Sequence, residues 1–259
     1  MTRADIINEL NNRGYEVEAK DIVKNGITKQ GMMLKTGNNV SPTVYFDDLV
    51  DRFDTVESLA DECIRLFDDS LNRTPDIDVH SIFERDFILN NCFIGLQKSS
   101  DEDLIKDDTE FDGIEQYVYV RFPMGNGMGS VKLNPQIVDM ANVTVETVFR
   151  NARKNTFAET EFVDLGEMIG HDKIGTVCVT NKHKFKGASA ILNRAALEQY
   201  ADAHNMHSII VIPSSIHECI IVPYESDAFK MFDSIISDVN NSSVAPEERL
   251  ADRVYVIEV

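Results

Sequence analysis

Short β-type segments joined by tight turns constrain the fold of this chain more than any other feature. Asn25-Gly26 lies between two such segments in YEVEAKDIVKNGITKQGMMLKT, and Asn126-Gly127 lies between two more in QYVYVRFPMGNGMGSVKLNP. Asn-Gly is the preferred pair for a two-residue hairpin turn, because both positions take positive φ angles. Further along, HSIIVIP and ECIIVP flank a loop that starts at Pro213, which ends a strand because it has no N–H to donate. The sequence therefore predicts three antiparallel hairpins.

Helical periodicity and N-cap residues predict helices between and after these hairpins. The expected helices cover residues 2–12, 55–73, 144–157, 193–205 and 226–241. FILNNCFIGLQ, residues 87–97, fits a strand or a helix, and FKGASAIL, residues 185–192, fits a short strand or a loop. RVYVIEV, residues 253–259, predicts a last strand that pairs inside a sheet.

These elements predict an α+β fold in which helices pack against antiparallel hairpins. We expect two lobes of similar size, joined near residue 160. Residues 1–160 form the first, which includes an acidic region at residues 47–115, and residues 161–259 form the second, which includes the PSSIHE hairpin.

The cysteines indicate a reducing compartment. Cys63, Cys92, Cys178 and Cys219 are far apart, lie in apolar runs and form no CxxC pair, so we expect buried reduced thiols and no zinc site. No apolar run approaches the roughly 20 residues that span a bilayer, and the first residues lack the apolar core of a signal peptide. We therefore expect a cytoplasmic protein.

Negative charge is concentrated in one region. The net charge is −19, and residues 47–115 hold 21 acidic and 6 basic side chains, which gives −15. Such a field repels nucleic acid and anionic membranes and attracts basic proteins or cations. The alternative is that the charge only aids solubility. The candidate partner-binding residues are Asp101, Glu102, Asp103, Asp107, Asp108, Glu110 and Asp112.

The insert between HSIIVIP and ECIIVP contains Ser214, His217 and Glu218, which could be a catalytic cluster or a turn. A Ser–His pair also needs an orienting acid and oxyanion donors, and no GxSxG elbow occurs in the sequence. We therefore expect a structural or ligand-binding loop. The candidate ligand-binding residues are Ser214, Ser215, His217 and Lys186.

Two other patterns resemble binding loops only in part. Asp108, Glu110, Asp112 and Gly113 match the start of a calcium-binding EF-hand loop, but Tyr119 stands where its bidentate Glu is required. The glycine-rich segment at residues 123–130 is followed by a strand, whereas a phosphate-binding loop is followed by a helix. We expect no metal site and no cofactor.

Four segments resemble an uncharacterised bacterial family, the domain of unknown function 5688. They are NVSPTVYFDDLVD, NKHKFKGASAIL, PSSIHE and PEERLADRVYVIE. Residues 79–115 depart from the pattern of that family. Its members resemble cargo genes of mobile elements, and this resemblance implies a role in conflict between such elements and their hosts.

The leading hypothesis is a non-catalytic interaction protein whose acidic region docks on a basic protein surface. A nucleic-acid-processing enzyme is the expected partner, because spaced carboxylates can imitate phosphates and inhibit it. We expect no direct contact with nucleic acid or membrane. The first alternative is a hydrolase or transferase that uses Ser214, His217 and Glu218, and the second is a small-ligand-binding protein. The sequence leaves the oligomeric state open.

Overall fold

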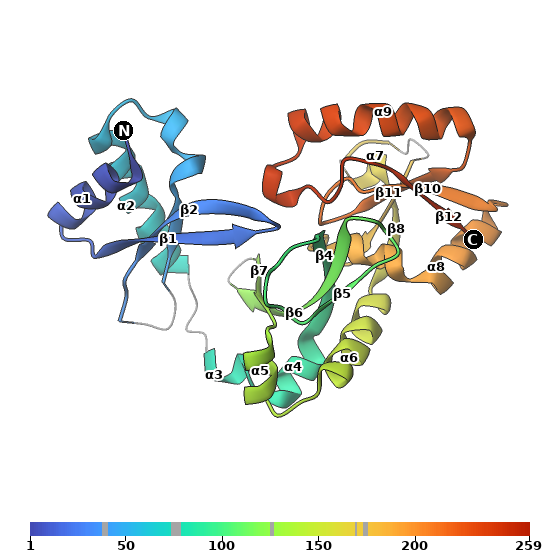
Figure 1. Cartoon of the computed structure of the whole chain (residues 1–259), viewed down its shortest axis with the longest axis horizontal. Coiled ribbons are helices and arrows are strands. Elements are labelled where there is room, and N and C mark those ends of the chain that lie inside the picture. Colours follow the sequence, from blue (N-terminus) through green and yellow to red (C-terminus); the bar gives the residue numbers. More distant parts are fainter. Residues whose placement is uncertain (38–40, 74–78, 125–126, 169, 173–175) are drawn as a thin grey trace. The chain divides into compact units, whose positions relative to one another are not determined.

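The computed structural model describes residues 1–37, 41–73, 79–124, 127–168, 170–172 and 176–259. Within them the strands form three antiparallel sheets, and helices pack beside these sheets, which confirms the α+β fold (Figure 1). The chain divides into two compact units. The first comprises residues 1–79 with 123–127, and the second comprises residues 80–122 with 128–259.

The first unit contains two helices, one sheet and two 3₁₀ turns among its described residues. Its elements are α1 (Arg3–Asn12), β1 (Val17–Lys24), β2 (Ile27–Leu34), β3 (Thr43–Tyr45), η1 (Phe46–Asp48), η2 (Val50–Arg52) and α2 (Val56–Arg73). The strands run in the order β1-β2-β3. Asn25 and Gly26 connect β1 to β2 with φ angles of 49° and 75°, so the first predicted hairpin turn is confirmed.

The core of the first unit lies between its two helices and its sheet. Ile6 and Leu10 of α1 are fully buried, and so is Met32 of β2. Leu59, Cys63 and Phe67 of α2 join the same apolar cluster at the helical spacing that the sequence indicated. Thr2 starts α1 through a capping box with Asp5.

The second unit begins with α3 (Val79–Ile82), whose first residue belongs to the first unit. The following elements are α4 (Arg85–Asn91), β4 (Cys92–Lys98), β5 (Lys106–Asp108), β6 (Ile114–Met124), β7 (Gly127–Lys132), α5 (Pro135–Met140) and α6 (Val145–Phe157). The ambiguous segment at residues 87–97 therefore contains both the end of a helix and a strand. β6 pairs with β4, β5 and β7 in what we call the middle sheet. The second hairpin joins β6 to β7, and Asn126 at its expected tip lies outside the described residues.

The remaining elements form the C-terminal sheet and its helices. They are β8 (Thr160–Asp164), α7 (Leu165–Met168), β9 (Val177–Asn181), η3 (Gly187–Leu192), α8 (Arg194–Ala203), β10 (Ser208–Ile212), β11 (Cys219–Pro223), α9 (Ser226–Ser243), η4 (Pro246–Glu248) and β12 (Tyr255–Glu258). The strand order is β12-β10-β11-β9-β8, so the third predicted hairpin, β10–β11, is confirmed. Two expectations are wrong. β12 takes an edge position, and residues 187–192 form a 3₁₀ helix.

The middle and C-terminal sheets share one apolar core. Leu96 of β4 and Ile114 of β6 belong to the same buried cluster as Val179, Ile209 and Ile221 of the C-terminal sheet. The boundary expected near residue 160 therefore falls inside the second unit, because apolar contacts join the elements on both sides of it. The acidic region at residues 47–115 is divided between the two units and does not belong to a single lobe.

Candidate functional site

The loop between β10 and β11 is fixed to the segment that follows β9. The Lys186 N–H donates to Nδ1 of His217 across 3.1 Å, and the Thr180 hydroxyl donates to the His217 carbonyl across 2.8 Å. Lys186 takes the left-handed conformation with φ of 52°, which turns the chain into η3. Gly187 then lies so close that an added Cβ would be 2.7 Å from the His217 carbonyl oxygen. The structure thus brings together the predicted ligand-binding residues Lys186 and His217.

The hydrogen bond to Nδ1 decides which nitrogen of His217 carries the proton in the neutral ring. Nδ1 accepts the Lys186 N–H, so the ring proton lies on Nε2. Nε2 lies 3.6 Å from Oε1 of Glu248. A catalytic histidine needs an unprotonated nitrogen facing its nucleophile, and here that nitrogen accepts a main-chain N–H. In this arrangement His217 acts as a bridge between two loops.

The serines of the loop have different roles. The Ser215 hydroxyl donates to Glu218 across 2.7 Å and accepts the His217 N–H across 3.0 Å, which closes the turn from within. Among the described residues, no hydrogen bond joins Ser214 to His217. Ser214 instead borders a cavity beside α9. Ser214, His217 and Glu218 are therefore not assembled as a nucleophile, base and orienting acid, while Ser215 is part of the His217 arrangement.

The side chain of Lys186 extends to the aromatic residues of β6. Its ammonium group donates to the Tyr117 hydroxyl across 2.9 Å and lies 5.2 Å from the centre of the Tyr119 ring. This position adds a cation–π interaction to the hydrogen bond. Burial raises the pKa of both phenols, so neither tyrosine can act as a base near neutral pH. Lys186 is held in place by aromatic faces.

Sequence reasoning missed an unusual buried pair next to these rings. The Tyr119 hydroxyl and Nη1 of Arg121 are buried without a hydrogen-bond partner within the described structure. The other terminal nitrogen of Arg121, Nη2, does have partners. It donates to Glu159 across 2.7 and 2.9 Å, and the guanidinium stacks 3.8 Å from the Phe93 ring centre. The sequence predicted a strand here, but nothing in it distinguished Arg121 from an exposed strand residue, and the first eight residues of β6 are all buried.

A buried polar network holds the acidic segment that precedes β5, residues 99–105. Gln97, which is 1% exposed, donates to Glu102 across 2.9 Å and to Glu115 across 2.7 Å. Lys132 donates to both oxygens of Glu102, and Lys106 donates to both oxygens of Glu115. Burial lowers the pKa of Lys132, and Glu102 opposes that change. The network thus joins β4, β6 and β7 to the segment.

The seven predicted partner-binding carboxylates fall into three groups. Glu102 is turned inward to Lys132 at 2.9 Å. Glu110 pairs with Arg194, and Asp112 pairs with Arg253 at 2.8 Å. The third group is exposed and has no basic partner among the described residues. We call it the acidic face, and it consists of Asp101, Asp103, Asp107 and Asp108.

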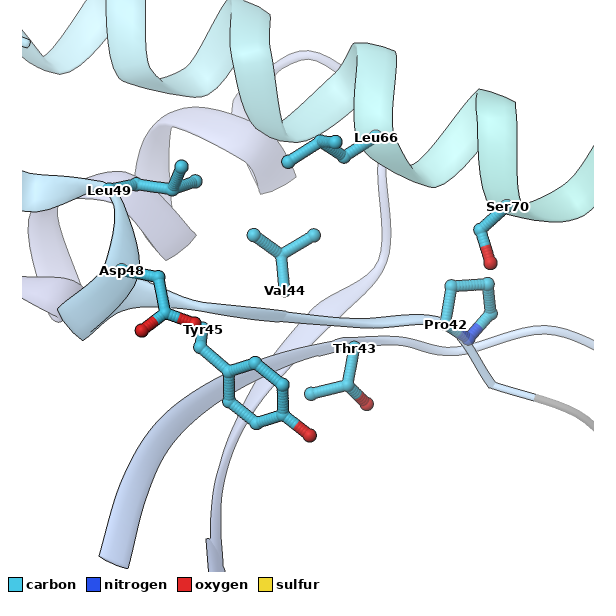
Figure 2. A pocket seen from close by; sticks show the side chains of 8 residues that line it. All are labelled: Pro42, Thr43, Val44, Tyr45, Asp48, Leu49, Leu66 and Ser70. Carbon is cyan, nitrogen blue, oxygen red and sulfur yellow. The ribbon is translucent and has the colours of Figure 1, made fainter. Parts of the chain in front are cut away.

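The first unit has a separate pocket of about 260 Å³. Figure 2 shows Val44, Leu49 and Leu66 pointing into it, with polar groups of other residues at its margin. One of these, Asp48, is paired with Lys29 at 2.5 Å. Part of NVSPTVYFDDLVD, one of the four segments that resemble the family, lines this pocket, since Pro42 to Tyr45 belong to it. The lining suits a small apolar group better than a charged ligand.

A second cavity of about 200 Å³ lies beside α9 in the second unit. Its lining is almost entirely apolar and includes Ile212, Ile220 and Phe232. Ser214 is the one predicted ligand-binding residue among those that line it. Sequence periodicity predicted a helix over residues 226–241, but it did not reveal that this helix covers its strands only in part.

The remaining expectations concern metal ions and membranes. In the part of the chain that the structure describes, no three His, Cys, Asp or Glu side chains converge as metal ligands would. A search of the same residues finds no helix with the length and apolarity required to cross a bilayer.

The model of a protein family described as a family of unknown function, DUF5688, matches residues 2–258. No curated protein and no solved structure matches the chain.

Proposed function

The chain belongs to the family DUF5688, and we propose that it is a non-catalytic protein that binds a basic protein surface through its acidic face. Asp101, Asp103, Asp107 and Asp108 are the residues that make the contact. The proposed location is the cytoplasm, which is supported by four buried cysteines that form no disulfide.

The proposal depends on one observation, the fixed position of the acidic face. Many other carboxylates already have a basic partner. On α2, Asp61 pairs with Arg13 at 2.5 Å, and Glu62 and Asp69 both pair with Arg65. All four carboxylates of the acidic face are exposed. Asp101 and Asp103 flank Glu102, which Gln97 and Lys132 hold, and Asp107 and Asp108 lie on β5, which pairs with β6. Binding to a preorganised surface loses less conformational entropy than binding to a flexible loop.

Electrostatics sets the expected strength of this interaction. An exposed ion pair contributes roughly 0.2–1 kcal/mol, so four pairs contribute about 1–4 kcal/mol. Screening shortens the range of these charges from about 10 Å at 0.1 M salt to about 3 Å at 1 M salt. We therefore expect binding that weakens strongly as salt is raised.

A nucleic-acid-processing enzyme is the proposed partner. Such enzymes present basic grooves that select spaced negative charges, and the carboxylates of the acidic face can occupy positions otherwise taken by phosphates. The chain would then act as an inhibitor that competes with nucleic acid. Family resemblance to cargo genes of mobile elements supports a role against such an enzyme in the host or in a competing element.

The test is a pull-down from host lysate with the tagged chain at low and high salt. The variant D101N/D103N/D107N/D108N removes the acidic face. The matched control D51N/D54N/E57Q/D68N removes the same number of charges from exposed positions of the first unit. We expect one stoichiometric basic protein that is retained by the control variant and lost with the acidic-face variant and at high salt. Equal retention by both variants, or retention at high salt, contradicts the proposal.

Asp107 and Asp108 also lie on β5, a short strand at the edge of the middle sheet. Charged side chains on such strands prevent edge-to-edge aggregation, and this would be a purely structural role. Light scattering of the acidic-face variant separates the two roles. Aggregation without loss of a partner assigns the carboxylates to solubility, whereas a monodisperse variant that loses its partner supports binding.

A further inference from the structure

The apolar sector of α9 is wider than the part that the C-terminal sheet covers. In Figure 1, α9 is the long helix near the C-terminal end of the colour scale, and it lies over β10 and β11. Ile236 is buried against Ile210 of β10 and Val254, and Phe229 and Phe232 pack at the edge of the same cluster. These residues form the side of α9 that packs against the C-terminal sheet.

A second apolar stripe continues from the covered side into solvent. Met231, Ile235 and Val239 recur every four residues and therefore lie above one another on the helix. Their exposed fractions are 51%, 42% and 49%. Three large apolar side chains at this spacing form a continuous strip of the kind that marks an interaction site.

The stripe borders the 200 Å³ cavity. Ile235 and Val239 line that cavity together with Ile212 and Ile220 of the neighbouring strands, and Ser214 lies among its lining residues. An apolar cavity of about 150 Å³ is large enough to hold benzene. The cavity beside α9 therefore has room for one large apolar side chain of a partner. We call the stripe and the cavity together the α9 groove.

The charges beside the groove determine which partner fits it. Asp227 precedes Met231 by four residues and Asp238 follows Ile235 by three, so both carboxylates lie along the outer border of the stripe. A second copy of the chain would bring two molecules of net charge −19 together, which like-charge repulsion opposes. A segment with apolar and basic residues would satisfy both the stripe and its border.

We propose that the α9 groove binds an amphipathic helix of another protein, with one apolar side chain in the cavity and Lys or Arg beside Asp227 and Asp238. Helices bind such grooves through apolar anchors at i, i+3 or i+4, and i+7, which match the four-residue repeat of the stripe. This inference is independent of the acidic face, because it depends on a different helix and on apolar contacts.

The test uses the full chain and a fluorescent helical peptide made of Leu and Lys with a 3.6-residue apolar period. A scrambled peptide of equal composition and a peptide with Glu in place of Lys are the ligand controls. Ile235→Asp and Val239→Asp place a charge in the groove, while Ser237→Asp places the same charge on an exposed position of α9 away from the stripe. Ile235→Ala shortens the side chain without adding a charge.

We expect saturable anisotropy changes with the Leu/Lys peptide and at least tenfold weaker binding of both control peptides. Ile235→Asp and Val239→Asp should weaken binding at least tenfold, Ile235→Ala about threefold or more, and Ser237→Asp less than twofold. The acidic-face variant D101N/D103N/D107N/D108N should bind the peptide normally. Equal binding to the scrambled peptide, or loss of binding in that variant alone, overturns the proposal.

Two further measurements identify a different occupant. Sedimentation that shows a wild-type dimer abolished by Ile235→Asp would assign the groove to self-association and reject the partner helix. Flotation with phosphatidylcholine vesicles that depends on Ile235 would assign it to a membrane surface, with the same consequence. Thermal unfolding within about 3 °C of wild type establishes that each variant is folded.

Discussion

The main-chain N–H of Lys186 donates a hydrogen bond to Nδ1 of His217 across 3.1 Å, although 31 residues separate the two in sequence. This bond gives His217 a structural role between the β10–β11 loop and the segment before η3. It also explains why the Ser, His and Glu of that loop need not signal catalysis. The ring nitrogen that would act as a base is used to fix the main chain.

His217→Ala should destabilise the protein by about 1–3 kcal/mol, because the Lys186 N–H loses its acceptor. His217→Asn should recover most of that loss, since the Asn Oδ1 can accept at the position of Nδ1. Urea unfolding of the three proteins measures the difference. If the His217→Ala and His217→Asn variants are equally destabilised, the hydrogen bond to Nδ1 does not explain the contribution of His217 to stability.

Gly187→Ala should lower the free energy of unfolding by about 1–3 kcal/mol. The new Cβ would lie 2.7 Å from the main-chain nitrogen of Asn181 and 2.7 Å from the carbonyl oxygen of His217. Both neighbours are main-chain atoms and cannot rotate away. Gly37→Ala is the control, since nothing lies within 4 Å of its added Cβ. Thermal unfolding should show a lower Tm for the first variant and no change for the second.

The network beneath the acidic face should make stability depend on pH. Burial tends to raise the pKa of Glu115, but hydrogen bonds from Gln97, Ser100 and Lys106 outweigh it and hold the pKa below its ordinary value of 4.5. A carboxyl with a lowered pKa stabilises the fold above its unfolded-state pKa. That stabilisation is lost as pH falls through the folded-state value.

Glu115→Gln should therefore lower the unfolding free energy at pH 7 by about 1–3 kcal/mol and reduce its further loss between pH 5 and pH 3. Urea unfolding at several pH values measures both effects. Glu57→Gln, at an exposed position of α2, is the control and should follow the wild-type curve. A Glu115→Gln curve parallel to wild type would show that Glu115 does not contribute to the acid sensitivity.

The thiols should be unreactive in the folded protein. Burial raises the pKa of Cys63 and of Cys92 to about 12 and that of Cys178 to about 11, and it also raises the pKa of Cys219. Because the thiolate is the reactive form, a thiol reagent at pH 8 should label none of them quickly. In urea all four should react. Rapid labelling of a native thiol would reveal local opening around that cysteine.

The sequence predicted the elements with the strongest local signals. Asn25-Gly26 needs positive φ angles, and Thr2 and Thr144 satisfy the first N–H groups of their helices, so local chemistry determined these turns and helix starts. The ambiguity at residues 87–97 had a physical cause. Asn91 ends α4 and Cys92 begins β4, so the segment contains two structures without a turn signal between them.

Long-range packing could not be predicted in the same way. Ile114 packs in the same core as the C-terminal sheet, so residue 160 lies inside the second unit and not at a boundary between units. No local sequence pattern encodes that contact. The candidate site shows the same limit. Asp101 and Glu102 are adjacent acidic residues in the sequence. Glu102 turns inward because Lys132 lies within reach of its carboxylate in the folded protein. Partner choice among charged side chains depends on the assembled sheet.

The network around Gln97 makes the position of the acidic face depend on a completely formed middle sheet. Its members come from three strands, so the position of the segment at residues 99–105 in the folded protein depends on β4, β6 and β7 together. A partly folded chain would carry the same carboxylates without displaying them in a fixed array. If the proposed basic partner binds the acidic face, titration with it would count only the completely folded molecules in a preparation and would serve as an assay of refolding yield.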